Sequence, residues 1–289
     1  MTDFVIGTAQ FGMNYGIANS VGQPSAYTVN KIIEYATEHE VFYYDTAIAY
    51  GDSEQVLGRA FDELGVCQRV KVFTKIPKLK ESSSPESIVD SVSRSIERLR
   101  VEKIFGILLH NELDHLYLKE LIKLKGRGLC EYVGTSTGHD ASFNRNLIRD
   151  QNLDLIQLPA NLLDRRNLIP EIIENQEGKK IAVRSVYLQG LFSMTSRVLS
   201  GFHKTLGPLL ERLRRVAENS EMSIHEMALR YILSYSPKYV VVGVESIQQF
   251  QSNLTWFKKG ALEKKIVDQI NAISYDLDFK LITPHQWPR

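Results

Sequence analysis

Short apolar runs alternate with longer amphipathic segments along the 289 residues of the chain. The runs are rich in Val, Ile, Phe and Tyr, which is typical of parallel strands buried on both faces. Eight of them are predicted to be strands: Asp3–Thr8, Val41–Tyr44, Val70–Thr74, Ile104–Leu109, Glu131–Gly134, Leu153–Leu158, Ile181–Val186 and Tyr239–Val242.

The segments between these runs are predicted to be amphipathic helices. Ser84 before Pro85 indicates a helix start, and Ser223-x-x-Glu226 and Ser246-x-x-Gln249 are capping boxes. Four segments place apolar residues at the spacing of one buried helix face: Val29, Ile32, Ile33 and Ala36; Ile88, Val89, Val92, Ile96 and Leu99; Ile224, Met227, Ala228, Tyr231 and Ile232; and Ile247, Phe250, Leu254 and Phe257.

Alternating strands and helices form either a closed barrel or a doubly wound open sheet. Eight strands favour the barrel, and Gly7-Thr8-Ala9-Gln10-Phe11-Gly12 does not fit the dinucleotide-binding fingerprint of the open sheet. We therefore predict an α/β protein with a (β/α)8 TIM barrel fold, as a single domain over residues 1–289. Long segments from Gln10 to Ser25 and from Gln189 to Gly207 are predicted to be active-site loops.

Charge and composition narrow the partners and the location. With 35 basic and 34 acidic residues, the chain has a net charge of +1, so we expect neither a nucleic acid nor a membrane partner. No apolar run approaches the roughly 18 residues of a membrane-spanning helix. The first residues do not resemble a signal peptide, and we expect Cys67 and Cys130 to be reduced thiols. These features predict a cytoplasmic protein.

Ionisable side chains follow three consecutive strands of the predicted barrel. Asp45, Lys75 and His110 come directly after the second, third and fourth runs, and Tyr50 lies five residues beyond Asp45. Active sites of such barrels lie at the carboxyl ends of the strands. Each residue alone has an ordinary structural explanation, but together they suit general acid catalysis. We expect Lys75 to lower the pKa of Tyr50, Asp45 to keep Lys75 charged, and His110 to bind a substrate oxygen.

These residues stand in recognisable sequence contexts. Tyr44-Asp45-Thr46-Ala47-x-x-Tyr50-Gly51, with Ser53-Glu54-x-x-Leu57-Gly58 after it, resembles the signature of the aldo-keto reductase family. Phe73-Thr74-Lys75 and Leu108-Leu109-His110 resemble its next two blocks. The resemblance implies a (β/α)8 barrel, no metal, NADPH or NADH as the hydride donor, and reversible reduction of an aldehyde or ketone. The catalytic tetrad of the family falls on Asp45, Tyr50, Lys75 and His110.

The same resemblance implies where the cofactor binds. Its site residues would come from the ends of strands and from the last helix. They are Gly7 and Thr8 after the first strand; Ser136, Thr137 and Gln157 at the nicotinamide carboxamide; Arg184, Ser185, Leu188, Gln189 and Gly190 over the pyrophosphate; Gly243, Val244, Glu245, Ser246 and Gln249 at a phosphate; and Asn253 near the adenine. For Ser246 and Gln249, a capping box explains the residues equally well, and Asn253 also suits a polar surface.

The chain departs from the family pattern at two cofactor positions. Arg184 stands where an aromatic side chain usually lies under the nicotinamide, although a guanidinium plane can also stack on a ring. Glu245 and Gln249 stand where Arg or Lys usually reads the 2′-phosphate of NADPH, and a carboxylate suits a free ribose hydroxyl. NADH therefore stays open beside NADPH, which the nearby Lys258 and Lys259 favour.

Substrate and alternative functions follow from fewer residues. The loop from Gln10 to Asn19 and Arg184 favour a small carbonyl substrate that is polar, such as a sugar-like or anionic compound, although Met13 and Tyr15 can equally pack under the loop. A nicotinamide-binding regulatory module with little turnover is one alternative, against which the intact tetrad argues. A lyase or isomerase that forms a Schiff base on Lys75 is another, but Asp45 would keep that lysine protonated. The sequence leaves the oligomeric state open.

Overall fold

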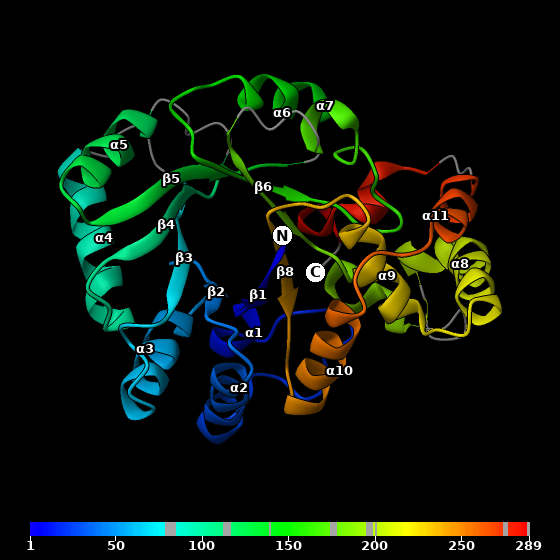
Figure 1. The fold of residues 1–289 in the computed structure, drawn as a ribbon, viewed down its shortest axis with the longest axis horizontal. Coiled ribbons are helices and arrows are strands. Elements are labelled where there is room, and N and C mark those ends of the chain that lie inside the picture. Colours follow the sequence, from blue (N-terminus) through cyan, green and yellow to red (C-terminus); the bar gives the residue numbers. More distant parts are fainter. Residues whose placement is uncertain are drawn as a thin grey trace.

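A computed structural model describes residues 1–78, 85–111, 117–138, 140–173, 178–194, 199, 201–273 and 277–287. Eight parallel strands close into a barrel in chain order, with β8 hydrogen-bonded to β1. Helices surround the strands (Figure 1). The strands are β1 Asp3–Gly7, β2 Tyr43–Asp45, β3 Lys71–Ile76, β4 Ile104–Leu109, β5 Cys130–Ser136, β6 Leu155–Pro159, β7 Lys180–Arg184 and β8 Tyr239–Gly243. The predicted TIM barrel is confirmed.

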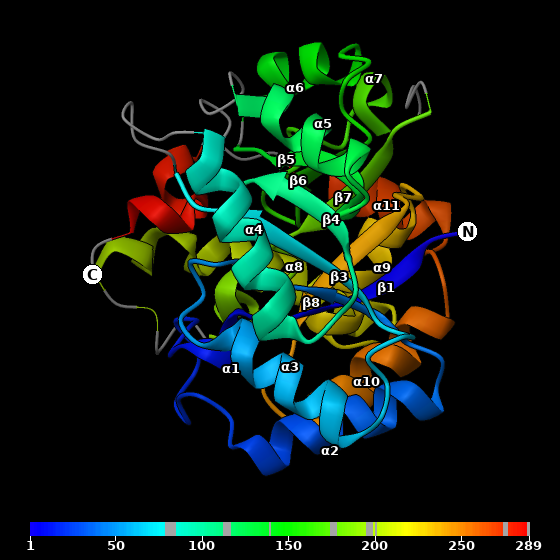
Figure 2. The same cartoon turned by 90° about the vertical axis from the view of Figure 1, so that its left-hand side faces the viewer.

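The helices lie outside the barrel and in the connections at its ends. The α-helices are α1 Ala9–Gly12, α2 Ala26–Glu38, α3 Ser53–Glu63, α4 Pro85–Leu99, α5 Leu118–Gly126, α6 Ala141–Ile148, α7 Pro170–Ile173, α8 Gly207–Asn219, α9 Ile224–Leu233, α10 Ile247–Lys258 and α11 Lys264–Asn271. Short 3-10 helices are η2 Leu188–Ser193, η3 Gly201–Leu206, η4 Phe279–Ile282 and η5 Pro284–Gln286. Figure 2 shows the N-terminus and the C-terminal segment at opposite ends of the molecule.

The predicted helix faces form the outer layer of the core. All four apolar residues of α2 on the predicted face, from Val29 to Ala36, are fully buried. Ser223 and Ser246 cap α9 and α10, where their hydroxyls accept from the backbone N–H of Glu226 and Gln249. Ile247 and Phe257 are only partly buried, because they lie at the two ends of α10. The predicted cap at Ser84 lies outside the described residues.

An aromatic cluster fills the amino-terminal end of the barrel. Phe73 and Phe105 pack edge to face, with ring centres 5.2 Å apart, and each also contacts Tyr43 and Tyr239. Lysine ammonium groups lie over the outer rings, including Lys180 at 4.1 Å from the centre of Tyr132. These contacts make the end of the barrel that lies away from the strand carboxyl ends a packed core.

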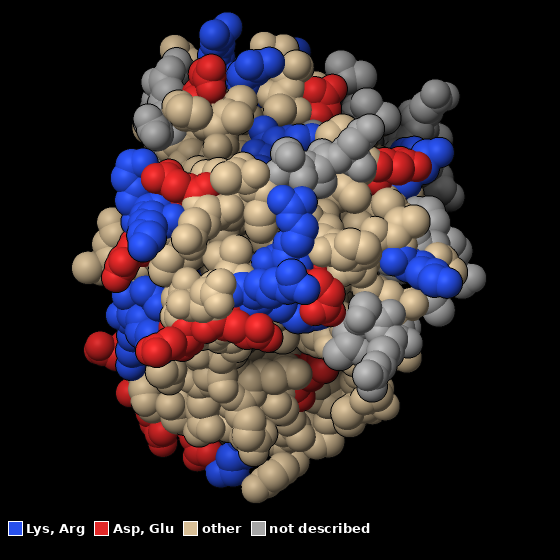
Figure 3. All heavy atoms as spheres, turned by 90° about the vertical axis from the view of Figure 1, so that its right-hand side faces the viewer, with Lys and Arg blue, Asp and Glu red and all other residues tan. Residues whose placement is uncertain are grey.

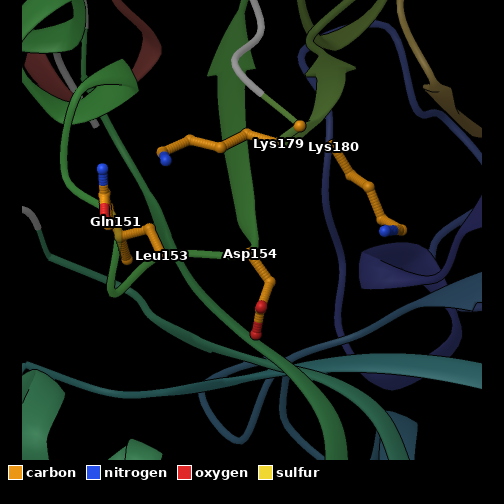
Figure 4. Close-up of a pocket in the computed structure, with 6 residues that line it drawn as sticks. Gln151, Leu153, Asp154, Lys179 and Lys180 are labelled. Atoms are coloured by element: carbon orange, nitrogen blue, oxygen red, sulfur yellow. The ribbon is translucent and has the colours of Figure 1, made fainter.

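A separate cavity of about 380 Å³ lies at the amino-terminal ends of β6 and β7 (Figure 4). Lys179 and Lys180 point away from each other there, and the Asp154 side chain points away from both. Asp154 accepts from Lys125 Nζ at 2.7 Å and from the backbone N–H of Val133 at 2.9 Å. The carboxylate is thus already neutralised, and this cavity lies far from the carboxyl ends of the strands.

Charged side chains of both signs lie on the surface of the barrel, and both cysteines are free. Lys and Arg side chains are interspersed with Asp and Glu over the face shown in Figure 3. In the described part of the chain, no helix is both long and apolar enough to cross a membrane. Cys67 and Cys130 are free thiols, and burial raises the pKa of Cys130 to about 12. The two cysteines therefore do not pair with each other in this fold.

Candidate active site

Asp45 and Lys75 form a buried ion pair at the carboxyl ends of β2 and β3. Lys75 Nζ donates to Asp45 Oδ2 at 2.7 Å and to the backbone carbonyl of Thr46 at 2.7 Å. The Lys75 side chain has no exposed surface, and that of Asp45 is 5% exposed. The strand register produces the pair, because Asp45 lies beside Phe73 and Lys75 follows two residues later, on the same face of β3.

Tyr50 and His110 complete the group at the same end of the barrel. The two rings pack edge to face with centres 5.7 Å apart, and Lys75 Nζ lies 5.1 Å from the centre of the Tyr50 ring. A tight turn directs Tyr50 inward: its N–H donates to Ala47 O, and Gly51 follows with a φ of 58°. The structure thus brings together all four residues predicted to be catalytic.

The ionisation of these groups differs from the expected pattern in one respect. Burial and the nearby Asp45 raise the pKa of Tyr50, and the cation that opposes this rise is Arg184. Lys75, which we expected to lower it, is instead directed at Asp45 and Thr46. Burial lowers the pKa of Lys75, against the effect of Asp45, and it lowers the pKa of His110 to about 3. At neutral pH, Tyr50 therefore holds its proton and His110 is neutral.

A chain of polar contacts leads from the ion pair across the barrel. Gln157 Nε2 donates to Asp45 Oδ1 at 2.7 Å, and Gln157 Oε1 accepts from Ser136 Oγ at 3.1 Å. Arg184 Nε lies 3.4 Å from Ser136 Oγ, and Arg184 Nη2 donates to the backbone carbonyl of Thr137 at 2.8 Å. The predicted nicotinamide residues of β5, β6 and β7 are therefore one connected cluster beside the tetrad.

Two signature residues of α3 are buried and hold strand ends in place. Ser53 Oγ donates to the carbonyl of Thr8 at 2.9 Å and accepts from Thr46 Oγ1 at 2.9 Å. Glu54 is 2% exposed and accepts from Thr74 Oγ1 at 2.6 Å and from Arg98 Nε at 2.8 Å. These side chains position the ends of β1, β2 and β3 and do not face the site.

The loops after β1 and β7 meet over the mouth of the barrel. The N–H of Ile17 donates to the carbonyl of Gln189 at 3.0 Å, and Gln189 Nε2 donates to the Tyr15 hydroxyl at 3.0 Å. A Cβ on Gly190 would lie 2.6 Å from that of Ala18, so the close approach requires glycine. Because this contact bridges β1 and β7, it passes across the end of the intervening β8.

Tyr15, which the sequence left open between packing and substrate binding, lies beside the predicted catalytic residues. Burial and the nearby Tyr50 raise its pKa, while the charges of Arg184 and Lys75 act in the opposite direction. Its hydroxyl therefore lies among the groups of the predicted active site. The available signal was only an aromatic residue in a long loop, which suits packing as well as binding.

The β7 loop concentrates unusual backbone conformations. Ser185, Leu188 and Gln189 have φ values of 64°, 46° and 54°, and Gly190 follows at 88°. Non-glycine residues rarely adopt positive φ, and such strain clusters at ligand-binding loops. Leu188 is fully buried, so its side chain anchors the loop in the core and only its backbone is available to a cofactor.

The start of α10 has the form of a phosphate-binding turn, although its side chains bond to each other. Gln249 Oε1 accepts from the N–H of Glu245 at 2.8 Å, while the Ser246 hydroxyl accepts from the N–H of Gln249 at 3.2 Å. Glu245 is partly buried, and burial raises its pKa. Asn253 Oδ1 accepts from the Tyr187 hydroxyl at 2.7 Å, and Asn253 is 4% exposed.

Three further predicted cofactor residues are largely enclosed in the fold. Thr8 is fully buried, and its hydroxyl donates to the carbonyl of Asp45 at 2.9 Å. Val244 is also fully buried, and Gly7 lies in register with Gly243. These three residues shape the barrel end, and any direct contact that they make with a cofactor would come from their backbone.

The cluster around Thr137 suits a carboxamide. Ser136 and Gln157 present hydroxyl and amide groups, which both donate and accept. Thr137 Oγ1 is buried and has no hydrogen-bond partner within the described residues. Buried hydroxyl groups are normally satisfied. An amide group bound here would supply the missing partner, and the residues present thus fit the nicotinamide of the implied cofactor.

Comparisons with known proteins agree with this geometry. The model of the Aldo/keto reductase family matches residues 3–275. D-arabinose 1-dehydrogenase of Saccharomyces cerevisiae is 25% identical over 283 residues, which cover 87% of this chain and 81% of that protein.

Solved structures share the fold. Aldo-keto reductase AKR11C1 from Bacillus halodurans, in its holo form, has a TM-score of 0.75 at 22% identity over 94% of this chain and 92% of that one. Glycerol dehydrogenase AKR11B4 from Gluconobacter oxydans has a TM-score of 0.72 at 23% identity over 95% and 93%. The match to the family model, together with the dehydrogenase relative, supports an oxidoreductase that acts on carbonyl compounds. The chain belongs to the aldo-keto reductase family.

Proposed function

We propose that this protein reduces an aldehyde or ketone to an alcohol with hydride from NADPH or NADH, and that Tyr50 donates the proton. The observation that carries the proposal is the convergence of Tyr50, His110 and the Asp45–Lys75 pair at one barrel end. The bound nicotinamide supplies the hydride that goes to the carbonyl carbon.

The side chains have separate tasks in this mechanism. Tyr50 is protonated at neutral pH because its pKa is raised, so it is in the form that donates a proton to the carbonyl oxygen. His110 is neutral and offers a ring nitrogen to the same oxygen. As Tyr50 loses its proton, the charge of Arg184 stabilises the phenolate. Ser136, Thr137 and Gln157 hold the carboxamide.

The other cofactor contacts follow the shape of the barrel end. The loop of Ser185, Leu188, Gln189 and Gly190 covers the pyrophosphate. The turn from Gly243 to Ser246 would hold a phosphate at the start of α10, where the helix dipole favours an anion, if Gln249 Oε1 released the N–H of Glu245. Gly7 and Thr8 shape the neighbouring strand end. Gln249 and Asn253 would contact the adenosine.

A small polar carbonyl compound is the proposed substrate. Tyr15, Gln189 and Arg184 line the approach with hydroxyl, amide and guanidinium groups. A relative from Saccharomyces cerevisiae is named D-arabinose 1-dehydrogenase, which supports a sugar-like substrate for this chain as well.

The contacts of Lys75 argue against the Schiff-base alternative. Its side chain is fully buried, and Nζ donates to two oxygen acceptors. A Schiff base requires an exposed amine that can attack a carbonyl carbon. The pKa of Lys75 is lowered, but its buried amine is not accessible to a substrate.

Substitution of Tyr50 by Phe tests the proposed mechanism. Loss of a general acid should lower carbonyl-dependent oxidation of NAD(P)H by about 100- to 10,000-fold, with cofactor affinity retained. Tyr27→Phe, on the exposed surface of α2, is the matched control and should leave turnover unchanged. Near-normal turnover of Tyr50→Phe would sink the assignment of the proton donor.

A further inference from the structure

Arg184 brings a positive charge into the site that no carboxylate of the described residues neutralises. Its guanidinium contacts three neutral oxygen atoms, those of Ser136 Oγ at 3.4 Å, Thr137 O at 2.8 Å and Ser185 Oγ at 3.0 Å. Within the described residues, no Asp or Glu forms an ion pair with it, whereas Lys75 has Asp45. Arginine stays protonated over the whole working pH range.

The charges around the tetrad therefore do not cancel. The pKa values of Tyr50, Lys75 and His110 respond to one carboxylate, Asp45, and to two cations, Lys75 and Arg184. Tyr50 and His110 are both neutral at pH 7. The Asp45–Lys75 pair has no net charge, so the excess charge of this cluster is that of Arg184.

The position of Arg184 relates this charge to the two redox forms of the cofactor. Arg184 touches Ser136 and Thr137, the residues that the proposed function gives to the carboxamide. The nicotinamide ring is attached to that carboxamide. The ring is neutral in the reduced cofactor and carries one positive charge in the oxidised cofactor. The two forms are otherwise nearly identical in size and in their contacts.

We propose that Arg184 makes the cofactor site select the reduced form, by repelling the positive ring of NAD(P)+. This inference rests on the proposed function, because it needs a nicotinamide at Ser136 and Thr137. Transfer of hydride from the ring to the carbonyl carbon, with a proton from Tyr50 to the oxygen, leaves a positive ring and a Tyr50 phenolate. Once Tyr50 takes up a proton from solvent, the positive ring is left beside Arg184. The oxidised cofactor is then expelled, and the site is ready for another reduced molecule.

The expected effect is large enough to measure. Two unit charges about 4 Å apart in a partly buried site interact strongly enough to change an affinity by more than tenfold. Arg184 is partly exposed, which screens the repulsion. We expect the oxidised form to bind roughly 10- to 100-fold more weakly than the reduced form. Each tenfold step corresponds to about 1.4 kcal/mol.

Calorimetric titration of the full chain with both redox forms tests the proposal. NADPH and NADP+, and separately NADH and NAD+, are titrated into the wild type, Arg184→Met, Arg184→Lys and the surface control Arg59→Met. The measured quantity is the ratio of the two dissociation constants, oxidised over reduced. General damage to the site affects both forms equally and cancels in this ratio. If Arg184→Met folds poorly, Arg184→Gln makes the same comparison and keeps amide donors.

The outcomes separate this inference from the proposed function. The proposal predicts that the ratio falls at least tenfold in Arg184→Met and stays within about threefold of wild type in Arg184→Lys and Arg59→Met. An unchanged ratio in Arg184→Met would overturn the role of the charge and leave the proposed function standing. Absence of binding by either form to the wild type would overturn the proposed function, and this inference with it.

Discussion

The Asp45–Lys75 pair allows a quantitative prediction about stability as well as catalysis. Both side chains are buried, and Asp45 also accepts from Gln157. Lys75→Met would leave a buried carboxylate with a single amide donor. Breaking a buried pair in this way costs about 3–5 kcal/mol of unfolding free energy, because the remaining charge is uncompensated.

The complementary changes should cost less. Asp45→Asn leaves Lys75 with the Thr46 carbonyl and an amide oxygen, and an amine whose pKa is already lowered can give up its proton. We expect Asp45→Asn to lower the unfolding free energy by about 2–3 kcal/mol. The double variant removes both charges and should cost clearly less than the sum of the single variants. The predicted coupling energy is about 2–3 kcal/mol.

Urea unfolding of the wild type and the three variants measures this coupling, with the midpoint and slope fitted for each. Lys103 and Glu131 provide the matched control, because this pair is exposed and its charged atoms are 3.9 Å apart. Its coupling should stay below about 1 kcal/mol. Additive losses at Asp45 and Lys75, with no coupling beyond that of the control, would refute the view that the buried pair acts as one unit.

Three further predictions follow from neighbouring contacts. Gln157→Leu removes the donor to Asp45 and the acceptor for the Ser136 hydroxyl. We expect the unfolding free energy in urea to fall by about 1–3 kcal/mol, and cofactor binding in titration to weaken. Gln151→Leu, at the far end of the barrel, is the control and should change neither quantity. Arg98→Met leaves the buried Glu54 carboxylate with hydroxyl donors only. This change should lower the unfolding free energy by about 2–3 kcal/mol and leave KM unchanged. A raised KM would show that Glu54 acts on the site. Because the pKa of His110 is lowered to about 3, the unfolded chain binds one more proton than the folded chain between pH 6.5 and about 3. The stability contributed by this group is therefore fully present above pH 6.5 and is lost as the pH falls towards 3. Unfolding free energies measured from pH 7 to pH 4 should accordingly fall less steeply in His110→Gln than in the wild type, and equal slopes would contradict the buried, neutral histidine.

The sequence predicted the barrel because buried parallel strands leave a strong pattern of apolar residues. It predicted strand ends less well, since hydrogen-bond pairing does not stop where apolar residues stop. β5 continues to Ser136, as Thr135 and Ser136 pair with Ile156 and Gln157 of β6. At the start of β2 the reverse occurs, because the N–H of Val41 donates to Ala36 and closes the end of α2.

The tetrad could be predicted because each member lies at or just beyond the carboxyl end of a strand or in a short turn. The course of a long loop is not periodic, so nothing in the sequence placed Tyr15 against Gln189. The pKa of Tyr50 could not be predicted either. It depends on burial and on the positions of Asp45 and Arg184 relative to Tyr50, and these are set by contacts between different strands.

The central claim is that this chain transfers hydride to a carbonyl compound, and isotope transfer tests it most directly. The purified protein is incubated with NADPH or NADH labelled with deuterium at C4 of the nicotinamide, together with a panel of small aldehydes and ketones that includes sugars. Mass spectrometry then follows the label. The account predicts an alcohol that carries deuterium on the former carbonyl carbon, formed by the wild type and not by Tyr50→Phe. If the protein binds the cofactor but no product carries the label, the fold serves as a nicotinamide-binding module and the reductase proposal is wrong.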